Sequence, residues 1–301
     1  MKKLLSLVLL TAFFVGNAQE TANRFFYELT FKPKKEAETT EKVMTVLDIT
    51  KDKSLFRDFT TIAQDSLLKA EIETMQKTGV YKDISKSMKM PKFAFKVTKK
   101  YPEMTIQYSE GMLNGMTPVQ LAYNDNPKFD WKIINEKTKI GEYNVQKATA
   151  DFGGRKWTAW FSADIPFQDG PYKFYGLPGL IVKVEDADKN YSWELKGNKK
   201  VQNFEELTQM EKMSPGGAGK IVEVSREKFE KTMEDYKKDP FSSFRSQMTP
   251  DVMARKIPGQ DKTIGEMIKD QEKMVKDFYN ANNNPIEVAA ETPPATKKKG
   301  K

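Results

Sequence analysis

The stretch Glu142–Ser162, EYNVQKATADFGGRKWTAWFS, reads as a β-hairpin built around Gly153-Gly154. Two consecutive glycines suit a two-residue hairpin turn, because both central residues of such a turn need a positive φ that glycine adopts without steric cost. We therefore predict antiparallel strands over Glu142–Phe152 and Arg155–Ser162. This pairing makes an antiparallel β protein the expected fold class.

Strand-like patterns continue on both sides of the hairpin. In Arg24–Phe31 every second residue from Phe25 onward is apolar, as in a strand with one buried face. The Gln64–Lys77 segment changes to a helical period, and Gly79 is its expected stop. The other predicted strands are Val43–Ile49, Leu55–Phe59, Lys92–Thr98, Met104–Ser109, Trp131–Asn135, Gly179–Glu185 and Tyr191–Leu195.

The C-terminal part of the chain is predicted to be helical. Ser225 caps a helix that ends before Pro240, and Thr263 with Glu266 forms a capping box for a second helix. The expected fold is α+β and predominantly antiparallel, a curved sheet or half-barrel with a few helices packed on it toward the C-terminus. The predicted divisions are a signal peptide (1–18), a β-rich domain (19–200), a mainly helical extension packed on it (201–284) and a disordered tail (285–301).

The N-terminus has the features of a cleavable secretory signal peptide. Lys2 and Lys3 precede an apolar run, Leu4–Val15, that is too short for a permanent membrane span. The small residues Gly16 and Ala18 suit a signal peptidase, so we predict cleavage after Ala18. We expect an exported protein, with the periplasm as the favoured compartment and the extracellular space as the alternative.

Composition removes several kinds of site. The chain contains no cysteine and no histidine. Disulfides, thiolate metal sites, cysteine nucleophiles and imidazole-dependent catalysis are therefore excluded. The formal net charge is +8, but acidic and basic residues interleave, and export separates the protein from nucleic acid. We expect no enzyme activity, no cofactor, no nucleic-acid partner and no transmembrane segment in the mature chain.

The densest motif follows the hairpin, at Gly176–Ile181, which reads Gly-Leu-Pro-Gly-Leu-Ile. Asp169–Phe174 lead into it, and Gly154–Trp160 form the strand before it. In these residues the sequence resembles the GLPGLI family, exported proteins of Gram-negative bacteria with no established activity. The resemblance also takes in Trp131–Ile133 and Lys53–Phe56, and it covers about residues 23–200.

Two interpretations of this motif are open. Family members often carry a cysteine before a central Gln-Lys-Ala, and because Val145 holds that position here, thiol chemistry is absent. The motif could be a tight crossover that plugs the core, which a Gly/Pro/Leu turn without reactive groups favours, or an apolar lip that receives a ligand or partner. The candidate binding residues are Trp157, Trp160, Gly170, Pro171, Phe174, Gly176, Leu177, Pro178, Gly179, Leu180 and Ile181.

Two other sets of residues suggest chemistry. Asp164, Asp169 and Glu185 flank the motif and could supply an acid–base pair, although charged residues at strand ends are normally solvated. Thioether sulfur binds Cu(I), although methionine more often fills irregular cores. The methionines considered for copper are Met88, Met90, Met104, Met112 and Met116.

The function predicted from the sequence is that of an exported, non-catalytic envelope protein. It would bind an apolar, lipid-like ligand or an outer-membrane protein partner. The alternatives are a structural or assembly factor tied to an outer-membrane receptor, and soft-metal (copper) binding through methionine. The sequence leaves the ligand and the oligomeric state open.

Overall fold

The computed structural model describes residues 20–80, 89, 91–114, 117–213, 221–256 and 261–288. The predicted signal peptide, Met88, Met90, Met116 and residues 289–301 of the predicted tail lie outside these ranges. The strands are β1 (Ala22–Phe31), β2 (Glu41–Ile49), β3 (Lys53–Asp58), β4 (Phe95–Lys100), β5 (Thr105–Asn114), β6 (Thr117–Asp125), β7 (Lys132–Ile140), β8 (Tyr143–Phe152), β9 (Arg155–Ser162), β10 (Leu180–Asp186), β11 (Tyr191–Val201) and β12 (Ile221–Glu223). The helices are α1 (Phe59–Thr78), α2 (Gln209–Met213), α3 (Arg226–Lys238), α4 (Ser242–Gln247), α5 (Pro250–Met253) and α6 (Ile264–Ala281).

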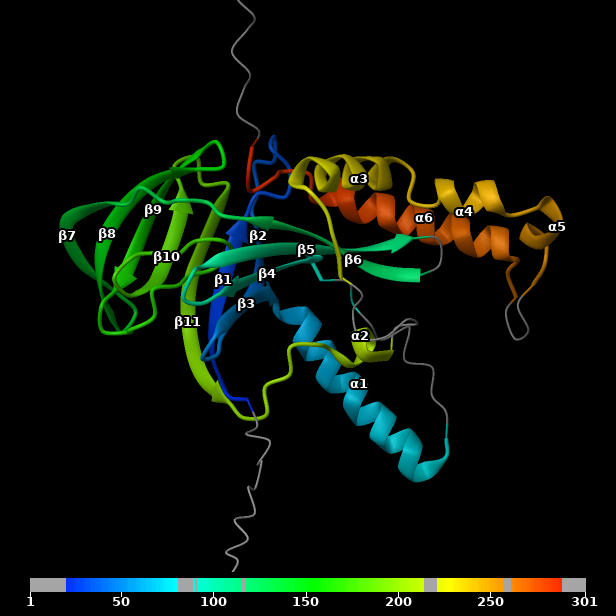
Figure 1. Ribbon diagram of the computed structural model, residues 1–301, viewed down its shortest axis with the longest axis horizontal. Helices are drawn as coiled ribbons and strands as arrows, with labels where there is room; N and C mark the ends of the chain where they lie inside the picture. The colour runs from blue at the N-terminus through cyan, green and yellow to red at the C-terminus, as the bar shows by residue number, and fades with distance from the viewer. Residues whose placement is uncertain are drawn as a thin grey trace, which may run out of the picture.

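Within the described residues, 12 strands form one unclosed sheet in the order β12-β6-β5-β4-β3-β2-β1-β11-β10-β9-β8-β7. The strand pairs are antiparallel except β12 with β6, which is parallel. Because β1 pairs with both β2 and β11, it joins the first half of the sheet to the second (Figure 1). The expectation of a predominantly antiparallel α+β fold is confirmed.

The hairpin predicted around Gly153-Gly154 is present. Strands β8 and β9 pair up to Phe152 and Arg155, and the two glycines between them have φ values of 55° and 71°. Both values lie in the left-handed region that a tight hairpin turn requires. The local signal was therefore sufficient to place this turn and both strands.

Helix α1 begins at Phe59, earlier than the predicted Gln64. The Asp58 carboxylate accepts a hydrogen bond from the backbone N–H of Thr60 and caps the helix there. Strand β3 consequently ends at Asp58, so the prediction that Phe59 belongs to a strand was wrong. The predicted stop is correct, since Gly79 has a φ of 68° and its N–H bonds to the carbonyl of Met75.

Strands β6 and β12 were not predicted. Pro118 stands near the start of β6, and proline weakens any strand pattern because it cannot donate to a neighbouring strand. Strand β12 has 3 residues, all exposed, which is too short for a hydrophobic period to be recognised. Its parallel pairing nevertheless attaches the C-terminal region to the edge of the sheet.

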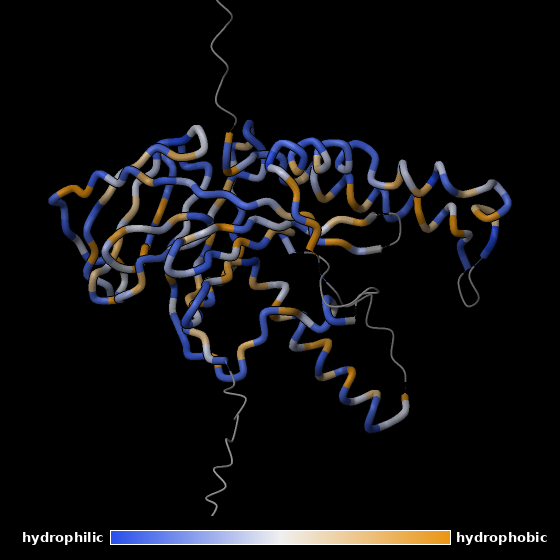
Figure 2. Tube along the Cα trace, in the orientation of Figure 1, coloured by the Kyte–Doolittle hydropathy of each residue, from blue (hydrophilic) through white to orange (hydrophobic). Residues whose placement is uncertain are grey.

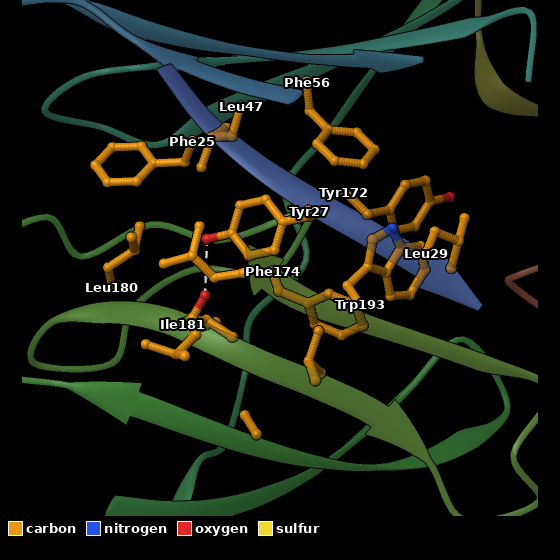
Figure 3. Close-up of a cluster of buried hydrophobic side chains, with 14 of the residues drawn as sticks. Phe25, Tyr27, Leu29, Leu47, Phe56, Tyr172, Phe174, Leu180, Ile181 and Trp193 are labelled. Atoms are coloured by element: carbon orange, nitrogen blue, oxygen red, sulfur yellow. Dashed lines mark hydrogen bonds between the residues drawn. The ribbon is translucent and has the colours of Figure 1, made fainter. Parts of the chain in front are cut away.

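Alternation along the strands gives the sheet two different faces. The side chains of β1 that enter the main core are Phe25, Tyr27, Leu29 and Phe31; Figure 3 shows the first three. We call this the inner face. The opposite, outer face carries buried charge at Arg24, Asp48 and Arg57: Arg24 of β1 is opposite Asp48 of β2, and Arg57 of β3 is opposite Val46, two residues before Asp48.

Helices lie on both faces of the β4–β6 half of the sheet. Helix α3, with α6 beside it, covers the inner face of β6, and α1 with α2 lies on the other side (Figure 1). The predicted caps are confirmed, with Ser225 capping α3 and a Thr263–Glu266 capping box opening α6. The helices mix hydrophilic and hydrophobic residues (Figure 2), and in the described part of the chain none is long and apolar enough to cross a membrane.

Candidate functional site

The predicted motif lies in the segment between β9 and β10, and its apolar side chains are buried. Leu177 is 1% exposed, and Leu180 and Ile181 are 0% exposed, within the main core; Figure 3 shows Leu180 and Ile181 there. Gly170, Pro171, Phe174, Gly179 and Trp157 are also buried, Trp160 is half-buried, and Gly176 and Pro178 are exposed. The motif therefore does not present an apolar lip to solvent.

A buried lysine fixes the entry to the motif. The Nζ of Lys99 lies 2.5 Å from the Oδ1 of Asp169, and both side chains are almost fully buried. The same ammonium group donates to three backbone carbonyls, those of Gly170, Tyr172 and Phe174, at 2.7, 3.0 and 3.2 Å. Burial lowers the pKa of Lys99, and the Asp169 carboxylate opposes that shift. This ion pair attaches the motif to β4.

The three carboxylates considered for acid–base chemistry do not share partners. Asp164 is exposed and accepts a hydrogen bond from Asn144, whereas Asp169 is buried against Lys99. Glu185 is half-buried and pairs with Lys183. Each carboxylate is thus neutralised or solvated separately.

A different set of residues forms a cleft of about 360 Å³ on the inner face, beneath α3 and α6. Its volume lies within the range of about 300–1,000 Å³ that is usual for small-molecule sites. We call it the aromatic cleft, because its lining includes Phe95, Tyr108, Tyr123, Tyr172, Phe229 and Tyr279. The rings pack in stacked and edge-to-face pairs, as with Tyr108 and Phe229 at 5.6 Å.

One wall of the aromatic cleft is held by Lys173, the residue after Tyr172 in the Asp169–Phe174 segment that leads into the motif. Its buried Nζ lies 2.7 Å from Asp125 Oδ2, 2.6 Å from Glu287 Oε1 and 2.9 Å from the Tyr123 hydroxyl. Burial alone would lower the pKa of Lys173, but Tyr123 and Glu287 outweigh it and the pKa is raised. Lys173 is therefore a charged, saturated structural centre that joins the motif to β6.

Glu287 belongs to a C-terminal strap, residues 284–288, that closes the same wall. The guanidinium of Arg155 donates to the carbonyls of Pro285 and Ile286, and the N–H of Val288 donates to the carbonyl of Gly153 at 2.8 Å. The prediction that disorder begins at residue 285 was therefore wrong. These residues are held mainly by polar contacts, and their sequence has no hydrophobic periodicity that would predict an ordered segment. Ile286 is the exception, because it is buried in the core.

Glu110 is the distinctive polar group of the aromatic cleft. It is 8% exposed and accepts hydrogen bonds from the hydroxyls of Tyr279 at 2.9 Å and Tyr108 at 3.3 Å. Burial raises its pKa, although Lys237 and the two tyrosines oppose the shift. Among the described residues Glu110 forms no ion pair, in contrast to Asp169 and Glu287.

Sequence reasoning missed Glu110, Tyr172 and Lys173. A signal for Glu110 existed, since Ile106, Tyr108 and Glu110 alternate on one face of β5 and a glutamate in that register is unusual.

In the described part of the chain no cluster of three acidic, cysteine or histidine side chains suitable for a metal ion is found. Of the methionines considered for copper, Met104 precedes β5 and Met112 lies within it.

Comparison with known proteins points to the same segment of the chain. A family model described as a protein of unknown function (Porph_ging) matches residues 153–183, which include β9, the motif and the start of β10. No curated protein matches the chain. Structures of PNGF-II in the C2 and P21 space groups are similar at 16% identity, with TM-scores of 0.48 and 0.47. The matches cover 72% of this chain, which spans only about a third (33% and 34%) of those chains.

Proposed function

We propose that the protein is an exported, non-catalytic binding protein of the cell envelope, in which the aromatic cleft receives an apolar ligand that carries a cationic group. Export is supported by the signal-like sequence of residues 1–18, and the relation to GLPGLI proteins by the complete hexapeptide at Gly176–Ile181. Most of the inner face is occupied by the main core, and the aromatic cleft beneath α3 and α6 is the part of it that could hold a ligand.

Glu110 carries the proposal for the ligand. A buried carboxylate is costly unless it is paired, and among the described residues Glu110 accepts from two hydroxyl groups without forming an ion pair, although Lys237 lines the same cleft. The rings of Tyr108 and Tyr279 already have the ammonium groups of Lys173 and Lys237 at 5.2 and 4.8 Å from their centroids. An ammonium group on an apolar ligand would therefore gain chiefly an ion pair with Glu110, while its apolar part packs against the aromatic lining of the cleft.

Replacing Glu110 by glutamine should weaken the binding of phenethylamine, a probe with one ring and one ammonium group. Loss of a charge-assisted contact predicts an affinity lower by about 10-fold or more, measured by isothermal titration calorimetry. The neutral analogue 2-phenylethanol should bind the parent and the variant equally weakly. Glu227→Gln, an exposed change on α3, is the charge-matched control and should leave the affinity unchanged.

The same variant should be at least as stable as the parent at neutral pH. Since burial raises the pKa of Glu110, the folded state favours the protonated carboxyl. That contribution to stability is complete below the ordinary carboxyl pKa and is lost as pH rises through the raised pKa. Glutamine at position 110 is neutral at every pH, so the variant does not lose this contribution to stability as pH rises. A large fall in stability, or unchanged phenethylamine affinity, would reject a binding role for Glu110.

Phenethylamine affinity in the parent should also rise with pH through the raised pKa of Glu110. Binding of the cation favours the ionised carboxylate, so protein below that pKa must release a proton. Calorimetry in two buffers of different ionisation enthalpy measures this release, which should be absent in Glu110→Gln.

The other functions considered from the sequence remain predictions. Copper capture depends on Met88, Met90 and Met116, which lie outside the described residues. Attachment to an outer-membrane receptor would be visible as one dominant crosslinked membrane protein in envelope preparations.

A further inference from the structure

The C-terminal strap (residues 284–288) lies on the body of the protein as a bound peptide lies on a receptor. It belongs to no strand or helix, since α6 ends at Ala281 and the strap follows without regular structure (red in Figure 1). Its hydrogen bonds reach residues far away in the sequence, among them Lys32 and Gly153. We call the surface beneath it the strap groove, which is formed by Gly153, Gly154, Arg155, Tyr172, Lys173, Tyr191 and Arg226.

Arg155 binds the backbone of the strap. Its Nη2 donates to the carbonyl of Pro285 at 2.8 Å, and its Nε donates to the carbonyl of Ile286 at 3.0 Å. Asp186 pairs with Nη1 of the same guanidinium at 3.0 Å and so fixes its orientation. Because these contacts are with carbonyl groups, Arg155 can hold an extended peptide of any sequence.

The two glycines of the β8–β9 turn allow the strap to approach this closely. A Cβ at Gly153 would lie 2.8 Å from the Cγ of Glu287, and a Cβ at Gly154 would lie 2.7 Å from the carbonyl oxygen of Val288. Both glycines belong to residues 153–183, which the Porph_ging family model matches. The turn that closes the hairpin is therefore also a contact surface for the strap.

Two side chains of the strap are buried in the body of the protein. Asn284 is 6% exposed, donates to the carbonyl of Lys32 at 3.1 Å and accepts from Arg155 at 3.0 Å. Ile286 is 7% exposed and packs in the main core. Pro285 between them is exposed, as in an extended segment whose alternate side chains point away from the surface. The strap groove thus has separate places for a polar and an aliphatic side chain.

Glu287 is the charged anchor of the strap. Its Oε1 lies 2.6 Å from the Nζ of Lys173 and accepts from the Tyr172 hydroxyl at 2.6 Å, and Arg226 donates to its Oε2 at 2.9 Å. Burial alone would raise the pKa of Glu287, but these partners outweigh it and the pKa is lowered. Because Lys173 is fully buried, a second carboxylate is the group best suited to replace Glu287 there.

The strap buries little apolar surface of its own. Ile286 is the one apolar side chain buried among residues 284–288, since Pro285 is exposed and Val288 is 40% exposed. Asn282 and Asn283 join the strap to α6 outside any helix or strand. Segments with few buried apolar contacts open at a lower free energy than the whole domain. The strap can therefore leave its groove while the sheet stays folded.

We propose that the strap groove is a peptide-binding site for an extended acidic segment of a partner protein, in which glutamate follows an aliphatic residue, and that the strap occupies this site in cis. The place of Ile286 selects the aliphatic side chain, and Lys173 with Arg226 selects the carboxylate. Since the strap is attached to the groove, it competes at high effective concentration with any partner. Binding at this groove does not depend on the function proposed for the aromatic cleft.

A fluorescein-labelled peptide with the sequence of residues 283–288, Asn-Asn-Pro-Ile-Glu-Val, tests the groove by fluorescence polarisation. In the full chain, Ile286→Ser combined with Glu287→Gln should release the strap and leave the groove residues unchanged. This strap variant should bind the peptide at least about 10-fold more tightly than the parent, whose own strap competes. Equal affinity in the two proteins, or no binding to the strap variant, would overturn the proposal.

A peptide with glutamine in place of its glutamate tests the carboxylate site. It should bind the strap variant about 10-fold or more weakly, because a charge-assisted contact is lost. Adding Arg226→Gln to the strap variant should weaken only the glutamate peptide, since Arg226 contacts the carboxylate. Lys231→Gln, an exposed change on α3, is the charge-matched control and should affect neither peptide. Equal losses for both peptides with Arg226→Gln would contradict the site.

Hydrogen–deuterium exchange of the parent tests the opening of the strap without any mutation, so it decides even if the strap variant does not fold. The amide of Val288 should exchange at least about 10-fold faster than that of Ile181, which is 0% exposed in the main core. Excess unlabelled peptide should accelerate exchange at Val288 and not at Ile181. Equally slow exchange at both amides, unchanged by peptide, would overturn the proposal. Glu110→Gln should leave these results unaltered, which separates this test from that of the aromatic cleft.

Discussion

Replacing Lys99 by methionine should lower the free energy of unfolding by about 3–5 kcal/mol, the usual effect of removing one partner of a buried ion pair. Methionine keeps much of the length of the side chain, so the loss reports charge and hydrogen bonds rather than volume. The variant leaves Asp169, which is 1% exposed, without a cation. It also leaves the carbonyls of Gly170, Tyr172 and Phe174 without their shared donor.

Urea denaturation measures this effect against a control on the same strand. Lys100 is the next residue and is exposed, so Lys100→Met should change the free energy of unfolding by no more than about 0.5 kcal/mol. Adding Asp169→Asn to Lys99→Met should recover part of the loss, because a neutral amide is less costly to bury than an unpaired carboxylate. Equal effects at Lys99 and Lys100 would show that the ion pair does not hold the motif.

Sequence alone could predict those parts of the fold that depend on neighbouring residues. The Gly153-Gly154 turn, the alternation in β1 and the caps at Ser225 and Thr263 each have a local cause, and each is where it was expected. Strand β12 has no such cause, because what places its 3 residues is the edge of β6. The pairing of β1 with β11 likewise depends on the whole sheet.

The candidate site was harder to predict because its polar groups come from distant segments. Lys173 lies in the segment that leads into the recognised motif, but its partners Asp125 and Glu287 lie at the end of β6 and in the C-terminal strap. No sequence spacing links these positions. Glu110 could have been suspected from the register of β5, but its partners, the hydroxyl of Tyr279 and the nearby Lys237, depend on which helices cover that strand.

Replacing Gly179 by alanine should cost about 2–6 kcal/mol, or prevent folding. Its φ of 144° is unfavourable for any residue with a Cβ, at about 1–3 kcal/mol. The added Cβ would also overlap the carbonyl oxygen of Ser162 and lie 2.9 Å from the Cα of Ala163. Both contacts are with backbone at the end of β9, which cannot rotate away, so overpacking adds about 1–3 kcal/mol.

Two other glycines make this prediction specific. Gly176 has a φ of 91°, but a methyl group added there would meet nothing within 4 Å, so Gly176→Ala should cost only the backbone term, about 1–2 kcal/mol. Gly197 has neither constraint, and Gly197→Ala should be neutral or gain up to about 1 kcal/mol. Soluble yield, circular dichroism and urea midpoints rank the three variants. A loss at Gly176 as large as that at Gly179 would mean that backbone strain alone governs the motif. A loss of stability that is largest at Gly179, smaller at Gly176 and absent at Gly197 would mean that the second glycine of Gly-Leu-Pro-Gly-Leu-Ile is required because the backbone at the end of β9 lies so close to it. This close contact would then set the start of β10.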